Sequence, residues 1–226
     1  MSTNPRDWSI RSAELRDAGA IAAIYNEAVR TTVATFDTAP RSVGAQRRWL
    51  AEHAGRLPVL VAERDGAVLG WASLSAWSDR RAYDGTAEVS VYVRQMDRGR
   101  GIGRHLLEEL IRTARERALH TLLSRIADRN PPSTHLHRSL GFRSVGVMRE
   151  VGFKFERWVD VELFERILEP VRLDGQAPDP LARGRIAGVA GRRQRPRGSP
   201  RVSRSSNGDP RARAPRRRCG HGNRAL

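Results

Sequence analysis

Apolar residues recur along the first 170 positions with two periods, one typical of helices and one typical of strands. The helical period predicts helices over 15–32, 41–55, 103–120 and 131–142. Shorter apolar or alternating runs predict strands over 7–14, 86–94 and 121–128, a hairpin over 57–77 and two closing strands within 143–168. This order predicts an α/β (α+β) domain, with a mixed, mostly antiparallel sheet flanked by helices.

The residues after position 170 do not have this periodicity. Phe164 is the last aromatic residue, and Gly, Pro, Ser and Arg dominate the C-terminal part of the chain. Residues 172–226 hold 15 arginines and 3 aspartates, and therefore most of the formal net charge of +16. Such a composition buries too little apolar surface to offset chain entropy. We expect a folded domain over 1–170 and a disordered basic tail over 171–226, which either has no function or binds nucleic acid or a membrane surface.

Composition also limits the class of protein. The sequence has no apolar run of about 18 residues, so we expect no membrane span. Its N-terminus lacks the apolar core of a signal peptide. Cys219 is the only cysteine, which excludes an intrachain disulfide and a cysteine-based zinc site. We therefore expect a cytoplasmic protein without a metal.

A glycine-rich turn joins the predicted strand over 86–94 to the helix that comes after it. The backbone N–H groups at a helix start are unpaired, and the helix dipole adds positive potential there. Glycines let an anion approach the backbone closely, and arginines add full charge. The predicted anion site consists of Arg98, Gly99, Arg100, Gly101, Ile102, Gly103 and Arg104.

Three kinds of phosphate loop can be compared with this turn. A nucleoside triphosphate loop ends in Gly-Lys-Ser/Thr, whereas Gly103 is followed by Arg104 and His105. A dinucleotide loop needs another glycine three positions after Gly101, where Arg104 stands. The third pattern, Arg/Gln-x-x-Gly-x-Gly/Ala, is matched by Arg98, Gly101 and Gly103.

This third pattern resembles the pyrophosphate loop of the GNAT superfamily of N-acetyltransferases. The segment "NPPSTHLHRSLGF" at 130–142 is similar to a later GNAT motif, and the order of elements fits over residues 9–167. The stretches "IYNEAV", "RRAYDGTAEVSVYVR" and "GFKFERWVDV" resemble the phosphinothricin and methionine sulfoximine N-acetyltransferases. The resemblance implies transfer of an acetyl group from acetyl-CoA to the amino group of a small amino acid-like acceptor, without a metal, by a homodimer.

Acetyl transfer needs a group that takes a proton from the amine and one that protonates the leaving thiolate. Glu88 lies in the strand over 86–94 among apolar residues, where a carboxylate is costly unless it has a task or a partner. The resemblance assigns it the role of base; the alternative is a structural carboxylate paired with an arginine. His137 stands where this subgroup has a histidine, and is either the acid or a surface histidine with a local hydrogen bond.

The resemblance also implies which residues bind the pantetheine arm of acetyl-CoA. Backbone groups of Val91, Tyr92 and Val93 would pair with the pantetheine arm, as an added strand does. Asn130 would hydrogen-bond the arm from the other side, and it can also begin the helix before Pro131.

The acceptor side is less specific. Arg80 could pair with an acidic group of the acceptor, while Phe36 and Tyr83 could wall the pocket and Lys154 adds a cation. Each of these four could instead be an ordinary surface charge or core aromatic.

Two departures and two other functions stay open. The subgroup's small residue or His-Gly before the tryptophan is replaced by residues 155–157, and Gly85 stands where a bulkier residue is often found. The acceptor could be a protein N-terminus or another amine, or the chain could bind nucleic acid through its tail.

Overall fold

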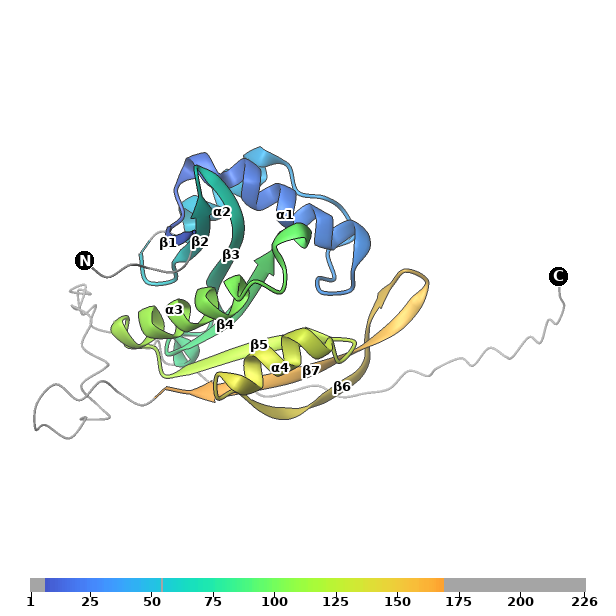
Figure 1. Cartoon of the computed structure of the whole chain (residues 1–226). Coiled ribbons are helices and arrows are strands. Elements are labelled where there is room, and N and C mark those ends of the chain that lie inside the picture. The colour runs from blue at the N-terminus through green and yellow to red at the C-terminus, as the bar shows by residue number, and fades with distance from the viewer. Residues whose placement is uncertain (1–6, 54, 169–226) are drawn as a thin grey trace, which may run out of the picture. The chain divides into compact units, whose positions relative to one another are not determined.

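The computed structural model describes residues 7–53 and 55–168, which form one central sheet with helices on both faces (Figure 1). Its strands are β1 (Ser9–Ser12), β2 (Val59–Arg64), β3 (Ala67–Ala76), β4 (Thr86–Val93), β5 (Thr121–Ala127), β6 (Arg143–Lys154) and β7 (Arg157–Ile167). Its α-helices are α1 (Ala18–Thr31), α2 (Val43–Glu52), α3 (Ile102–Glu116) and α4 (Pro131–Ser139). Short 3₁₀ turns are η1 (Leu15–Asp17), η2 (Arg81–Tyr83) and η3 (Gln95–Asp97).

The strands have the order β1-β2-β3-β4-β5-β7-β6 across the sheet. Every neighbouring pair is antiparallel except β4 and β5, which are parallel and joined through α3. The predicted fold class, with a mixed and mostly antiparallel sheet, is therefore confirmed. A parallel pair needs a crossover connection, and the amphipathic α3 supplies it.

The two faces of the sheet carry separate cores. On one face, α3 packs Leu106, Leu107 and Leu110 onto the sheet, and residues after α4 extend the same core. On the opposite face, α1 packs Ile21 and Tyr25 onto β2 and β3, and α2 adds Leu50. No helix of the described residues adds to the small third cluster that lies on β5 and β7 and consists of Ala127, Val159 and Val161, with Val33 packed against it.

Strands β4 and β5 are paired over only three residues, from Thr86 to Glu88 on β4. Beyond Glu88 the two strands diverge, as Figure 1 shows. Among the described residues, the remainder of β4 pairs with β3 on one edge and with no strand on the other. The fold thus leaves one edge of β4 open inside the sheet, at the end that leads into the glycine-rich turn.

The ends of several elements differ from the predictions. The helix predicted over 103–120 ends at Glu116, because Ala118 adopts a left-handed φ of 53° that no helix continues. The strand predicted over 7–14 is reduced to Ser9–Ser12, and η1 takes the first turn predicted for the first long helix.

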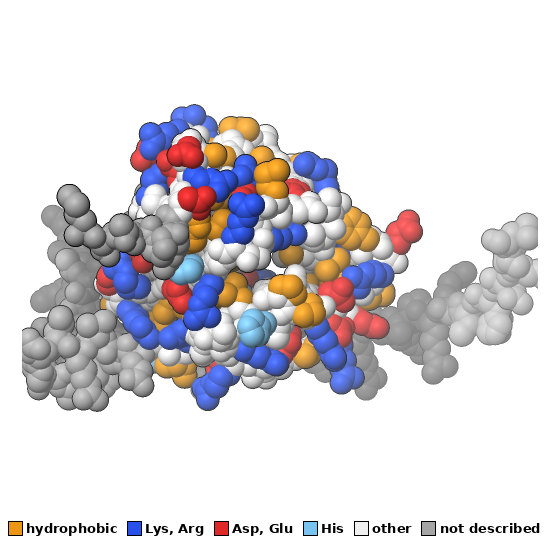
Figure 2. Space-filling model, viewed as in Figure 1, with side chains coloured by type: hydrophobic (Ala, Val, Ile, Leu, Met, Phe, Trp, Pro, Cys, Tyr) orange, Lys and Arg blue, Asp and Glu red, His pale blue; other side chains and the backbone are white. Residues whose placement is uncertain are grey.

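The surface of the described part carries both signs of charge. Figure 2 shows arginine and lysine side chains interleaved with aspartate and glutamate over the face that carries α3 and α4. Among these residues, no helix is long and apolar enough to cross a membrane, and no group of three or more His, Cys, Asp or Glu could hold a metal ion. The predicted tail over 171–226, with Cys219, lies outside the described residues.

Candidate active site

The glycine-rich turn leads from η3 into α3, at the open end of β4. Gly99 and Gly101 adopt φ values of 78° and 81°, which a side chain would strain. Gly101 is the N-cap of α3, and no side chain caps this end. The first N–H groups of α3 therefore remain available to an anion, with the positive end of the helix dipole behind them.

Three exposed or half-exposed arginines surround this helix end. Arg98 donates from Nε to the carbonyl of Val93 at 3.1 Å, so it bridges the turn and the end of β4. Arg100 lies 3.6 Å from buried Asp97. Arg104 pairs with Glu108 at 2.9 Å and donates to the Ser139 hydroxyl at 3.2 Å. The structure therefore brings all the predicted phosphate-binding residues to one place, as a connected loop beside the N-terminus of α3.

Gly103 packs this helix end against β4. A side-chain carbon at Gly103 would lie 3.5 Å from Val93 and 3.7 Å from Leu136 of α4. The open edge of β4 beside it carries the backbone of Val91, Tyr92 and Val93, which pair with β3 only on their other side. An extended ligand segment that added to this edge would reach the phosphate loop at one end.

Glu88 lies at the other end of this open edge, as the last residue of β4 that pairs with β5. Its side chain is only 18% exposed and forms a two-pronged ion pair with Arg125 of β5, in which Nε donates to Oε1 at 2.6 Å. The guanidinium of Arg125 also lies 5.7 Å from the ring centre of Trp77. Glu88 thus forms the pair with an arginine that the structural alternative predicted, and its role as the base stays a prediction.

His137 is buried in α4, against Phe142 and Phe164, so its predicted alternative as a surface histidine is wrong. Its Nδ1–H donates to the carbonyl of Ser133, one turn earlier, at 2.8 Å. Nε2 is then the unprotonated nitrogen, and it has no hydrogen-bond partner among the described residues. Burial lowers the pKa of His137, because the charged imidazolium would be poorly solvated there. A neutral imidazole at pH 7 weakens its candidacy as the acid.

Asn130 is the N-cap of α4. Its side-chain oxygen accepts a bond from the backbone N–H of Ser133 at 3.2 Å, and Pro131 is the first helical residue. The cap uses only the oxygen of the amide, and no described residue accepts a hydrogen bond from its NH₂ group. The predicted role at the helix start is confirmed, and it is compatible with the predicted contact to the pantetheine arm.

The connection between α1 and α2 carries Phe36 and is tied down by polar contacts from α1. The Tyr25 hydroxyl donates to Asp37 at 2.8 Å and shares a 2.7 Å hydrogen bond with Thr35. Asn26 exchanges two hydrogen bonds with the backbone of Arg41, at 2.7 and 2.8 Å. The "IYNEAV" stretch therefore fixes the connection that the predicted acceptor wall depends on.

Lys154 joins this connection to the hairpin of β6 and β7. Its ammonium group is buried and donates to the carbonyl of Thr35 at 2.8 Å. Burial lowers its pKa, and the carboxylate of Asp37 opposes that shift. A cavity of about 420 Å³ opens beside it, lined by Val29, Arg30, Thr38, Phe153, Lys154 and Phe155. This volume falls in the usual range of small-molecule sites.

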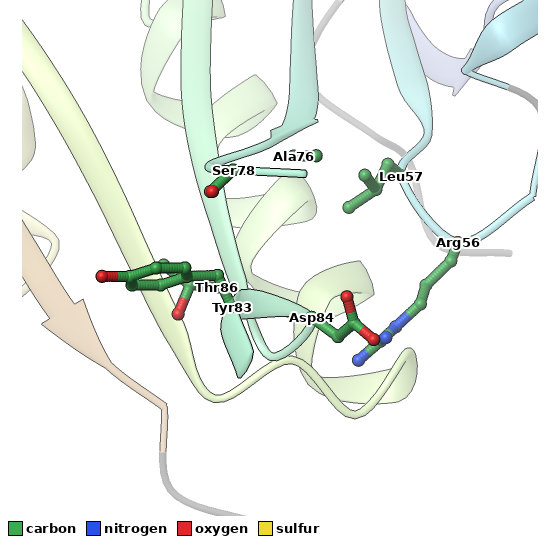
Figure 3. Close-up of a pocket in the computed structure, with 7 residues that line it drawn as sticks. All are labelled: Arg56, Leu57, Ala76, Ser78, Tyr83, Asp84 and Thr86. Carbon is green, nitrogen blue, oxygen red and sulfur yellow. The ribbon is translucent and has the colours of Figure 1, made fainter. Parts of the chain in front are cut away.

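The predicted acceptor residues Phe36, Arg80 and Tyr83 do not line one cavity. Tyr83 borders a cavity of about 130 Å³ together with Arg56, Leu57, Ala76, Ser78, Asp84 and Thr86 (Figure 3). In Figure 3 the side chains of Arg56 and Asp84 point toward one another. Arg80 is exposed at the start of η2, and Phe36 packs against Gly152 of β6. The cavity of about 130 Å³ beside Tyr83 is too small to hold a whole acceptor by itself.

Sequence reasoning did not single out Arg125. A charged residue in the apolar run "TLLSRIA" was the available indication, because it occupies the same strand face as Leu123 and Ala127. The partner of that charge is decided by the register of β4 and β5, which places Glu88 beside Leu123.

Comparison with known proteins gives a consistent result. Residues 10–170 match the family model described as "Acetyltransferase (GNAT) domain". The chain is 42% identical over 166 residues to the L-methionine sulfoximine/L-methionine sulfone acetyltransferase of Pseudomonas paraeruginosa, covering 73% of this chain and 96% of that protein.

Two solved structures extend this likeness to the fold. The ribosomal-protein-alanine N-acetyltransferase of Brucella melitensis is 42% identical with a TM-score of 0.69, over 71% of this chain and 99% of that one. A phosphinothricin acetyltransferase from Sinorhizobium meliloti, solved in complex with acetyl-CoA, is 33% identical with a TM-score of 0.71, over 77% of this chain and 95% of that one.

Proposed function

This chain belongs to the GNAT family of acetyltransferases, and we propose that it moves the acetyl group of acetyl-CoA to the amino group of a small amino acid-like acceptor. One observation carries the proposal. A strand edge left open within the sheet leads from Glu88 to an uncapped helix N-terminus with two left-handed glycines. The relatives named for methionine sulfoximine, methionine sulfone and phosphinothricin support the acceptor class.

The residues beside β4 fit the parts of acetyl-CoA. The pyrophosphate is doubly charged, and residues 98–104 offer backbone N–H groups together with arginines. The pantetheine arm has amide groups, and the open edge at Val91–Val93 offers main-chain partners for them. In this proposal Asn130 donates to the arm from α4, using the NH₂ group that its cap leaves free.

Glu88 acts as the base in the proposed reaction. The acceptor arrives as an ammonium ion, and one N–H proton passes to the Glu88 carboxylate, directly or through a water. The neutral nitrogen attacks the thioester carbon, a C–N bond forms, and the C–S bond breaks with its electron pair on sulfur. The nitrogen gives up its second proton to solvent to become the neutral amide, the thiolate takes up one proton from solvent, and Glu88 releases its proton to solvent. The products are the N-acetyl compound and the free thiol.

His137 is a weaker candidate for the final protonation. Its lowered pKa and its Nδ1–H bond to Ser133 describe a neutral ring that holds no spare proton at Nε2. We therefore propose that solvent protonates the thiolate and that His137 packs α4 beside the site. His137 can serve as the acid only if the bound substrate stabilises the protonated form of its ring.

A thiol-release assay tests the main proposal. The full-length chain is mixed with acetyl-CoA and a panel of amines that includes methionine sulfone, methionine sulfoximine, phosphinothricin and free amino acids. We expect thiol release with an amino acid-like acceptor, and a product whose mass is that of the N-acetyl derivative. No release with any of these acceptors would contradict the proposal.

A protein N-terminus is the second candidate acceptor, because the relative from Brucella melitensis bears the name of a ribosomal-protein-alanine N-acetyltransferase. Short peptides with an N-terminal alanine belong in the same panel. A higher kcat/KM for the peptides than for any free amino acid would favour this alternative.

A homodimer is proposed for the assembly. The strands β6 and β7 expose apolar side chains at Val145, Val147, Phe153 and Trp158, and the last two pack edge to face at 5.2 Å. Large exposed apolar patches usually mark an interface. We expect Val147→Glu to convert a dimer into a monomer in sedimentation, and an unaltered dimer would contradict this interface.

Three expectations concern the extent of the domain, the tail and the location of the protein. We propose that residues 1–170 form the whole acetyltransferase domain, so deletion of 171–226 should leave acetyl transfer intact. If the tail binds nucleic acid, that binding should depend steeply on salt and vanish in the shortened chain. The cytoplasmic location remains a prediction that depends on the single cysteine.

A further inference from the structure

The ion pair between Glu88 and Arg125 is open to exchange. Arg125 is 53% exposed although it stands in the middle of β5, and its only carboxylate partner among the described residues is Glu88. The side chain of Glu88 is more deeply buried than that of Arg125, since only 18% of it is exposed. Solvent therefore reaches the pair from the side of Arg125, where an ion that brings its own opposite charges could replace one partner of each group.

The two charges of this pair are complementary to those of an amino acid. An α-amino acid at neutral pH carries an ammonium group and a carboxylate that are both bonded to its Cα atom. A zwitterion that entered between the side chains would meet Glu88 with its ammonium group and Arg125 with its carboxylate. Every charge would then keep a partner, which matters where water is partly excluded.

The surroundings of Arg125 suit this exchange. The guanidinium has a planar fork that matches a carboxylate with two parallel bonds, and both prongs already bind one in this way. The ring of Trp77 beside it supports the guanidinium after Glu88 is released. The side chains of Glu88 and Arg125 also lie on the same sheet face, at the point where β4 and β5 diverge.

We propose that Arg125 binds the α-carboxylate of the acceptor, and that the Glu88–Arg125 pair is the element that selects α-amino acids over amines without an acid group. This inference rests on the proposed acetyl transfer and names the residue that determines its acceptor class. Release of Glu88 by the acceptor's own carboxylate couples binding to catalysis. The base loses its guanidinium partner only when a molecule with both groups is present.

Arg80 is the rival for this role, because sequence reasoning assigned it to an acidic group of the acceptor. Arg80 is exposed, and no ion pair joins it to another described residue. It lies at the start of η2, outside the pair that holds the proposed base. The two arginines can be separated by experiment, since each can be replaced alone.

The test compares methionine sulfone with its carboxamide, which keeps the amino group and the side chain but lacks the carboxylate. Thiol release gives kcat/KM for both acceptors with the full-length wild type, Arg125→Met, Arg125→Lys and Arg80→Met. Arg112→Met is the matched control, because Arg112 is an exposed arginine paired with Glu109 on α3. Calorimetry with acetyl-CoA shows that each variant retains a folded donor site.

We expect the wild type to prefer the acid over the amide. Arg125→Met should lower this preference at least tenfold, mainly by raising KM for the acid, and Arg125→Lys should keep part of it because a lysine retains charge but not the fork. Arg112→Met should retain the wild-type ratio. An unchanged ratio in Arg125→Met, or a loss confined to Arg80→Met, would overturn the assignment.

The outcomes also separate this inference from the proposed function. A wild type that acetylates the acid and the amide equally well keeps the acetyltransferase and removes the role of Arg125. A wild type that acetylates neither, nor any other amine in the panel, contradicts both. If Arg125→Met does not fold, the ratio measured with Arg125→Lys decides, because a wild-type ratio there excludes two-pronged recognition.

Discussion

The ring of Phe36 lies directly on Gly152, so that a Cβ atom at this glycine would overlap Cε2 and Cζ of the ring. The contact joins the connection between α1 and α2 to the hairpin of β6 and β7. Lys154 reinforces it through its bond to the Thr35 carbonyl. The connection between α1 and α2 is thus held against β6 by the close approach of one aromatic ring to a glycine.

We expect Gly152→Ala to destabilise the protein by roughly 1–3 kcal/mol, because the new methyl group overpacks this contact. The same change in a Phe36→Ala background should cost much less, since the ring that it meets is gone. Urea unfolding of the two single variants and the double variant measures the coupling.

Gly19→Ala is the control, because that helical glycine has nothing within 4 Å of an added methyl group. It should be neutral or slightly stabilising. Equal destabilisation by Gly152→Ala in both backgrounds would mean that the strand itself, and not the ring of Phe36, resists the side chain.

Replacement of the proposed base should separate chemistry from binding. Glu88→Gln keeps the shape of the side chain but removes its ability to take a proton, so we expect kcat to fall roughly a hundredfold or more. The dissociation constant of acetyl-CoA, from calorimetry, should change little. Glu63→Gln is the control, because Glu63 is also a strand carboxylate that pairs with an arginine, Arg11, toward the far edge of the sheet. Full turnover in Glu88→Gln would exclude it as the base.

Much of the fold, and the place of the candidate donor-site residues in it, could be predicted because the information is local. The strand that carries Glu88 and the turn that carries Gly101 are adjacent in sequence, and periodicity with turn chemistry defines both. The dipole and unpaired N–H groups of a helix start are properties of the helix itself. For these residues a correct order of elements was enough to place the glycine-rich turn beside β4; its role as a phosphate loop stays a prediction.

The acceptor side could not be predicted to the same depth, because its contacts join distant parts of the chain. Arg125 contacts Glu88 because of the parallel register of β4 and β5. Phe36 contacts Gly152, although the two residues are far apart in the sequence. Neither contact leaves a periodic pattern in the sequence. Arg80 and Tyr83 belong to the recognisable stretch "RRAYDGTAEVSVYVR", so the sequence indicates them as candidates. It does not determine which cavity they line.

The left-handed glycine at the start of α3 provides a test of the phosphate loop. Gly101→Ala should cost about 1 kcal/mol of stability through backbone strain, and it should also weaken acetyl-CoA binding several-fold, because the loop must alter its path. Gly66→Ala is a matched control, since Gly66 has a similar φ of 78° in the turn between β2 and β3. Both variants should lose similar stability in urea unfolding. Equal affinity for acetyl-CoA in both would contradict the role of the turn.

The buried ring of His137 predicts a pH dependence of stability. Its pKa is lowered in the folded protein, whereas the unfolded chain has the ordinary value of about 6.5. Above that pH neither state binds a proton at this residue, and no stability is lost. As the pH falls below it, the unfolded chain takes up a proton that the folded protein refuses, so the free energy of unfolding should fall by up to about 1.4 kcal/mol per pH unit.

We expect His137→Phe to remove this contribution, so that its stability declines less than that of the wild type between pH 7 and pH 5 in urea unfolding. His135→Gln on the same helix is the control, because His135 is exposed. His53, whose pKa burial also lowers, should contribute a similar but separate decline. An identical pH dependence in the wild type and in His137→Phe would mean that the ring binds a proton in the folded protein near neutral pH, which would restore His137 as the candidate that protonates the leaving thiolate.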